Sequence, residues 1–343
     1  MYENLAILAI FAFLYSAIAG RMEKTIISGP MIFVAFGLLF GDVGLGLLDM
    51  DVTETELRVI ADLTLALILF IDAANADLGI LKQRLQIPQR MLAVGLPLII
   101  FLGFVAGWLI FDSLTLFELA ILATMLAATD AALGKAVVTN QAVPPRIREG
   151  LNAESGLNDG ICVPILFVFI ALAVGTEVQH STMGLALKLV AQEIGIGLVV
   201  GMGLTFIGVK VLKYCFERGW VTDIWGQVPV VGLAWGSFAL AQSLHGSGYI
   251  AAFTGGMLFG YFAKHETHKL VHAAEGVGET FALLTWVVFG AAVVGDVFQY
   301  FNWQVVLYAV LSLTIVRMLP VYLSLTGTGE NNHSKLFLCL LYT

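Results

Sequence analysis

Long apolar runs separated by short polar breaks repeat along the whole chain. A helix needs about 20 predominantly apolar residues to cross a hydrocarbon core of ~30 Å. The runs therefore predict eleven membrane-spanning helices, which together form a single transmembrane domain over 1–343. We expect these spans near 4–20, 28–48, 57–76, 91–111, 115–140, 148–175, 186–209, 226–245, 248–263, 278–297 and 303–325.

Composition supports an all-α polytopic membrane protein. The chain is 59% hydrophobic and 12% charged, with a mean hydropathy of +0.91, whereas a soluble domain is about half apolar and a quarter charged. The first run, "MYENLAILAIFAFLYSAIAG", has no basic leader and no convincing cleavage site, so we expect it to be a retained helix. The cysteines Cys162, Cys215 and Cys339 have no metal-ligand spacing, and no nucleotide-binding loop or nucleic-acid patch is present. We therefore expect no cofactor, no nucleic-acid partner and no ATP-driven pumping.

The basic residues predict the orientation in the membrane. Thirteen of the 17 Lys and Arg residues follow odd-numbered spans. They are Arg21, Lys24, Lys82, Arg84, Arg90, Arg146, Arg148, Lys210, Lys213, Arg218, Lys264, Lys269 and Lys335. Lys and Arg in short loops stay on the cytoplasmic side. The pattern predicts a cell-membrane protein with its N-terminus outside and its odd-numbered loops in the cytoplasm.

Two basic residues lie inside predicted spans. Lys135 is about five residues from the cytoplasmic end of its span, so its long side chain can reach the interface. Arg317 lies deeper, and because an arginine keeps its proton, we expect it to pair with a carboxylate.

Two polar segments reach the same depth. Thr129 and Asp130 lie about ten residues before the cytoplasmic end of span 115–140, or ~15 Å at the helical rise. Asp159 is about eleven residues along the next span, which starts from the same side, and so reaches ~16 Å. The run "TDAALG" permits a local helix break, which is tolerated at this depth where the backbone lines a cavity.

The segment "LNAESGLNDG" places four polar residues on one helical face. Ser155 and Asp159 are four residues apart, and so are Glu154 and Asn158. Glu154 is at a depth of ~9 Å and Arg317 at ~12 Å, so we interpret these two as a structural ion pair.

These residue types suit a monovalent cation and a proton. Na⁺ prefers hard oxygen ligands, which Thr129, Ser155, Asp159 and the carbonyls of a broken helix can supply. Burial disfavours the charged form of a carboxyl group, so Asp159 can either hold a proton near neutral pH or bind the cation. The two occupancies exclude each other, which produces exchange. Asn158 stands where a second carboxylate could have been, which favours a neutral one-for-one cycle. Single acids elsewhere, such as Asp62, Asp72 and Glu193, can equally be satisfied hydrogen bonds between helices.

The segments "ATDAALGKAVVTN", "VPPRIREGLNAESGLNDG" and "GYIAAFTGGMLFG" resemble the Na⁺/H⁺ exchanger family, in its electroneutral branch. The resemblance implies an inverted-repeat antiporter fold with two broken core helices, a homodimer and a part in pH homeostasis. It implies that Asp159 is the shared ion and proton site, that Thr129 and Ser155 are ligands, that Asp130 and Asn158 support the helix crossing, and that Glu154 pairs with Arg317.

The chain departs from the family pattern after its eleventh span. Family members have about thirteen spans with a second broken helix beyond this point, whereas this chain reads "SKLFLCLLYT" and ends. We predict a secondary antiporter, not an enzyme, working by alternating access, with a truncated, non-transporting remnant as the alternative. An intramembrane aspartyl protease is less expected, since its Tyr-Asp and Gly-x-Gly-Asp pairs are replaced by Thr-Asp and Asn-Asp. A channel has no matching filter loop.

Overall fold

The computed structural model is helical throughout the part of the chain that it describes. The described residues are 2–22, 25, 27–48, 54–75, 89–128, 158, 161–162, 165–170, 172–174, 183–222, 225–262, 267–297 and 300–327. The α-helices are α1 (Tyr2–Met22), α2 (Gly29–Phe40), α3 (Glu54–Asn75), α6 (Leu96–Ile110), α7 (Leu116–Ala127), α10 (Met183–Glu217), α11 (Pro229–Ser243), α12 (Gly248–Phe262), α13 (Thr267–Val288), α14 (Gly295–Val297), α15 (Trp303–Leu311) and α16 (Arg317–Ser324). The predicted all-α class is confirmed.

Several α-helices continue into turns of another helical type. The π-helices are η1 (Met91–Gly95), η3 (Phe289–Val294) and η5 (Ser312–Val316), and η2 (Trp225–Gln227) is a 3₁₀ turn. Within the described ranges, five helical runs are long and apolar enough to cross a membrane. They are Tyr2–Met22, Met91–Ile110, Ala191–Glu217, Leu270–Val294 and Trp303–Ser324.

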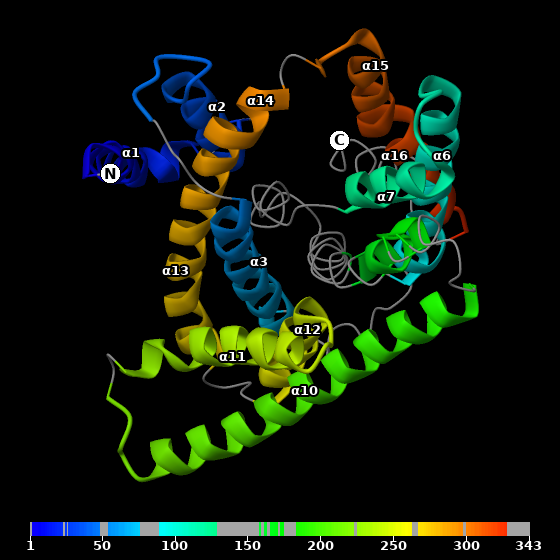
Figure 1. Cartoon of the computed structure of the whole chain (residues 1–343). Coiled ribbons are helices and arrows are strands. Elements are labelled where there is room, and N and C mark those ends of the chain that lie inside the picture. Colours follow the sequence, from blue (N-terminus) through cyan, green and yellow to red (C-terminus); the bar gives the residue numbers. More distant parts are fainter. Residues whose placement is uncertain are drawn as a thin grey trace.

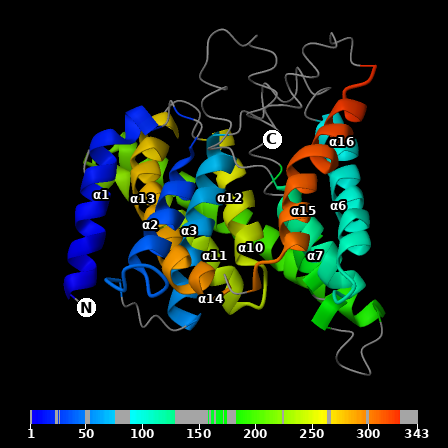
Figure 2. The same cartoon turned by 90° about the horizontal axis from the view of Figure 1, so that it is seen from above.

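The helices form two bundles with separate hydrophobic cores. Figures 1 and 2 show α6, α7, α15 and α16 together on one side, and α1, α2, α3, α11, α12 and α13 on the other. We call these the first and second bundles. The core of the first bundle contains Met91, Leu96, Ile99, Ala127, Cys162, Val316, Val321 and Leu325. The second bundle has two clusters, one among α3, α11, α12 and α13, against which α10 also packs, and one among α1, α2 and α13. Helix α13 therefore joins the two clusters.

The first bundle is assembled around the glycines of α6. A Cβ at Gly103 would lie 3.2 Å from the Cβ of Ala123 on α7, and a Cβ at Gly107 would lie 3.0 Å from a methyl group of Leu119. Small residues at this spacing let two helix backbones approach closely. The hydroxyl of Tyr308 on α15 donates to the carbonyl of Gly103 at 3.2 Å, which joins the third helix to the pair.

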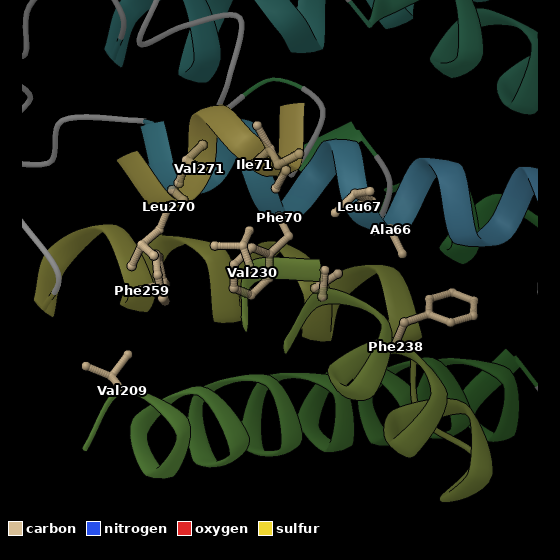
Figure 3. Packing of buried hydrophobic residues seen from close by; sticks show 14 residues of the cluster. Ala66, Leu67, Phe70, Ile71, Val209, Val230, Phe238, Phe259, Leu270 and Val271 are labelled. Atoms are coloured by element: carbon tan, nitrogen blue, oxygen red, sulfur yellow. The ribbon is translucent and has the colours of Figure 1, made fainter. Parts of the chain in front are cut away.

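The second bundle is packed around α12. Figure 3 shows side chains from α3, α11, α12 and α13 meeting in its core. The rings of Phe70 on α3 and Phe259 on α12 lie 5.8 Å apart. The backbones touch as well, because a Cβ at Gly256 would lie only 2.2 Å from the carbonyl oxygen of Phe70. On the other face of α12, a Cβ at Gly201 of α10 would lie 2.2 Å from the carbonyl oxygen of Ala251.

Candidate functional site

The predicted site divides into residues that the structure describes and residues that it does not. Thr129, Asp130, Glu154, Ser155 and Asp159 lie outside the described residues. Asn158 and Arg317 are described, together with the helix that leads to Thr129. The predicted roles of the five other residues, and the pairing of Glu154 with Arg317, therefore stay predictions.

Helix α7 ends inside the core of the first bundle, directly before Thr129. It begins with a capping box, in which Thr115 and Glu118 each bind the backbone N–H of the other. It ends at Ala127, which is fully buried, and Ala128 is extended with φ −60° and ψ 140°. The last carbonyls of a helix have no partner within the helix. A helix end in an apolar core therefore needs donors from elsewhere.

Arg317 supplies those donors. Its Nη2 lies 2.6 Å from the carbonyl oxygen of Ala128, 3.3 Å from that of Ala127 and 3.4 Å from that of Leu126. Arg317 stands where η5 passes into α16, so packing of this element against the first bundle fixes the guanidinium at the end of α7. A positive charge at a helix C-terminus also stabilises the helix dipole.

Asn158 belongs to the same bundle. Its side chain is 1% exposed, and its Oδ1 accepts a hydrogen bond from Sγ of Cys162 at 3.0 Å. Cys162 packs in the hydrophobic core that also contains Ala127. The segment of Asn158 and the end of α7 are thus held by one core.

Two of these features were missed by sequence reasoning. Cys162 received no role, although it is four residues after Asn158 and so on the same helical face. The binding of the carbonyls of Leu126, Ala127 and Ala128 by Arg317 was also not predicted. The contact of Arg317 with α7 could have been found from the predicted depth of Arg317 in the membrane. That depth is close to the predicted depth of the helix break as well as to that of Glu154.

Arg317 and the predicted ion ligands have different tasks. The guanidinium of Arg317 binds the carbonyls at the end of α7, so its positive charge compensates the negative end of the helix dipole before the chain continues to Thr129 and Asp130. Within the described residues, no group of three or more His, Cys, Asp or Glu side chains forms a metal site. The predicted ligands Thr129, Ser155 and Asp159 lie outside them.

Similarity to known proteins covers nearly the whole chain. A sequence model of the family described as "Sodium/hydrogen exchanger, transmembrane" matches residues 7–343. The Na(+)/H(+) antiporter ApNhaP of Aphanothece halophytica is 26% identical over 305 residues, which are 84% of this chain and 55% of that protein. The K(+)/H(+) antiporter NhaP2 of Shewanella sp. strain ANA-3 is 23% identical over 295 residues, which are 82% of this chain and 46% of that protein. The chain spans about half the length of these curated relatives.

The fold is similar to that of a solved antiporter. The structure of the sodium proton antiporter MjNhaP1 from Methanocaldococcus jannaschii at pH 8 superposes with a TM-score of 0.77 and 21% identity. The superposition covers 99% of this chain and 84% of that chain. This likeness confirms the predicted antiporter fold.

Proposed function

This chain belongs to the transmembrane family of sodium/hydrogen exchangers, and from that membership we propose that it exchanges a monovalent cation for protons across the bilayer. The relatives described above are named as Na⁺/H⁺ and K⁺/H⁺ antiporters. The observation that carries the proposal is the end of α7 within the first bundle, where Arg317 binds the last carbonyls before Thr129 in the sequence. Non-helical backbone at membrane depth is tolerated only where it is buried in protein or lines a cavity, and the ion sites of transporters are formed at such helix ends.

Asp159 is the centre of the proposed exchange. It binds either the cation or a proton, and Thr129 and Ser155 complete the oxygen ligands of the cation. Asp130 and Asn158 support the helix crossing. Competition for one carboxylate couples the two fluxes, and one charge exchanged for one charge makes the cycle electroneutral. The site faces the two sides of the membrane in turn, which is alternating access.

Movement of one bundle against the other suits this cycle. The described helices pack around separate cores, and Asn158 and Arg317 both belong to the first bundle. A rigid first bundle carrying the site can shift along the second without opening either core. We also propose that the protein is a homodimer in the cell membrane, with its N-terminus outside and its odd-numbered loops in the cytoplasm.

The rival functions have less support. An intramembrane aspartyl protease is an enzyme, whereas the family is one of secondary transporters. A non-transporting remnant would bind a cation without moving protons, so a transport assay separates it from an exchanger.

The test is cation-driven proton movement in proteoliposomes. Purified protein is reconstituted, a pH gradient is imposed, and collapse of the gradient is followed with a fluorescent dye after addition of Na⁺, Li⁺ or K⁺. The wild-type chain should collapse the gradient and Asp159→Ala should not. The matched control is Asp112→Asn, which removes an exposed carboxylate in the connection between α6 and α7 and should leave the response unchanged. Normal exchange by Asp159→Ala would contradict the proposed mechanism.

The same assay decides between the cations and tests electroneutrality. Both Na⁺ and K⁺ are named among the relatives, and hydroxyl and carboxylate ligands bind either. The half-saturating concentration of each cation gives the preference. A membrane voltage set with valinomycin should leave the rate unchanged if the cycle is one-for-one.

A further inference from the structure

A polar contact outside the site joins α3 to the beginning of α12. Oη of Tyr249 donates to Oδ1 of Asp62 at 2.5 Å, and both side chains are half-buried. The second carboxylate oxygen of Asp62 is 3.8 Å from Nε of Arg58, whose side chain is 78% exposed. Next to Asp62, Nε1 of Trp235 on α11 donates to the carbonyl of Leu63 at 3.0 Å. This part of α3 is therefore held firmly within the second bundle.

The ring of Tyr249 contacts the segment that follows the proposed ion site. Phe167 stacks on it with ring centroids 5.8 Å apart and an interplanar angle of 20°. Phe167 follows Asp159 by eight positions, and between them Cys162 packs in the core of the first bundle. The ring of Tyr249 also lies 5.2 Å from that of Phe238 in the second bundle. Tyr249 is thus a contact between the two bundles.

The two kinds of contact at Tyr249 respond differently to movement. An offset-stacked pair of rings contributes only a small attraction beyond the area that it buries, so a small shift of one ring across the other costs little. A hydroxyl that donates to a carboxylate makes a short, charge-assisted bond with a defined direction. The hydrogen bond therefore fixes the ring of Tyr249 on the second bundle, and the stacking contact holds Phe167 against that ring less strongly.

We propose that Tyr249, oriented by Asp62, is a positioning residue for ion exchange. Its ring is the surface on which Phe167 rests, and it keeps the Asp159 segment in place on the side of the membrane where α3 and α12 begin. Arg58 does not take part, because its side chain is exposed and only loosely paired. This role rests on the proposed antiport and adds the residues that hold the moving segment.

Cys162 is a natural reporter of this position, because it is 4% exposed and bound to Asn158. The full chain is prepared with Cys215→Ala and Cys339→Ala, and the rate at which a membrane-impermeant methanethiosulfonate modifies Cys162 is measured. Tyr249→Phe and Asp62→Ala should each raise this rate about tenfold, the change expected for loss of one charge-assisted hydrogen bond. The double variant should equal either single variant, since both remove the same bond.

Two further variants separate the hydrogen bond from the ion pair. Asp62→Asn keeps an oxygen that accepts from Tyr249 but loses the charge, so its rate should lie between those of the wild type and Asp62→Ala. Arg58→Ala removes only the ion pair and should have no effect, and Tyr261→Phe, on an exposed residue of α12, is the control for loss of a hydroxyl.

Three results would overturn the proposal. They are an unchanged rate in Tyr249→Phe, an equal rise in Asp62→Asn and Asp62→Ala, or a rise that tracks a fall in the unfolding midpoint and so reports general loosening. Modification of Cys162 requires no transport. A wild-type chain that failed to exchange ions would therefore refute the antiport and any role of Tyr249 in it, whereas the Cys162 rates would still decide whether Tyr249 holds the segment of Cys162 and Phe167.

Discussion

Arg317 donates hydrogen bonds to the carbonyls at the end of α7, which have no partner within the helix. Three carbonyls at this end would be left in an apolar core, and one guanidinium binds all of them. An arginine suits this place because its planar head carries several donors and keeps its charge when buried. The residue thus has a structural role whether or not it also pairs with Glu154.

Replacing Arg317 should loosen this helix end. Arg317→Ala leaves the carbonyls of Leu126, Ala127 and Ala128 without this donor, which should lower the free energy of unfolding by about 2 kcal/mol. Arg317→Lys keeps the charge and three donors but has a shorter side chain without the planar guanidinium, so we expect an intermediate loss. The measurement is an SDS titration followed by circular dichroism.

The control for Arg317 is an arginine at another helix end. Arg21→Ala, in the exposed last turn of α1, should change the free energy of unfolding by less than ~0.5 kcal/mol. Equal losses in Arg317→Ala and Arg21→Ala would show that the carbonyl contacts contribute nothing.

At the scale of the element, the glycines of α12 determine how closely this helix packs against α3. Gly256 and Gly260 are four residues apart and meet the carbonyl oxygens of Phe70 and Ala74 on α3, which have the same spacing. Two helices can approach this closely only where no Cβ intervenes. The absence of side chains on this face is therefore what sets the position of α12 between α3 and α10.

A single methyl group should separate these helices. Gly256→Ala would place a Cβ 2.2 Å from the carbonyl oxygen of Phe70, so α12 or α3 must shift, at a cost of about 2 kcal/mol or more. Gly203→Ala on α10 is the matched control, because a Cβ there would meet nothing within 4 Å. Alanine favours a helix by ~1 kcal/mol over glycine, so the control should be neutral or stabilising. Thermal unfolding in detergent measures both, and similar midpoints would contradict this account.

The sequence predicted helices better than it predicted where they stop. Apolar runs identify elements such as α6 and α15 because a helix in lipid must satisfy its own backbone. The run 115–140 also allowed a break near Asp130, but the end of α7 at Ala127 is bound by Arg317, which is 190 positions away. Hydropathy carries no information about such long-range donors. The same holds for η5, whose π-helical turn precedes Arg317.

The sequence predicted which residue types form the candidate site, but it did not predict the contacts between residues that are far apart in the chain. Helical periodicity predicts that Ser155 and Asp159 share one face, and this stays a prediction because both residues lie outside the described part of the chain. The hydrogen bond between Asp62 and Tyr249 does not follow from periodicity, because it joins residues 187 positions apart. Sequence reasoning allowed a helix-to-helix hydrogen bond for Asp62, and the structure identifies its partner.

At the scale of the whole molecule, the orientation can be tested with two described loops. Cys162, Cys215 and Cys339 are replaced by alanine, and a single cysteine is introduced as Asp112→Cys or as Glu217→Cys, both exposed. The proposed orientation puts position 112 outside and position 217 in the cytoplasm. An impermeant maleimide added to intact cells should therefore label only the first.

Permeabilised cells provide the control for this labelling. Both cysteines should react once the membrane is opened, which shows that each is accessible. Labelling of position 217 alone in intact cells would reverse the proposed orientation. Labelling of both would mean an even number of crossings between them, and so would remove one of the predicted spans 115–140, 148–175 and 186–209.

The separation of the two hydrophobic cores has a consequence for how such a protein diverges. Strain from a substitution passes through packed neighbours, and distant sites that share no partner behave independently. The first-bundle core shares no helix with the two second-bundle clusters among the described residues. Each core can therefore accumulate its own substitutions without compensation in the other. Two sequences that share about one residue in five, such as this chain and MjNhaP1, can therefore keep one architecture. Contacts between the two bundles, such as that of Tyr249 with Phe167, are different, because a change in one partner requires a change in the other.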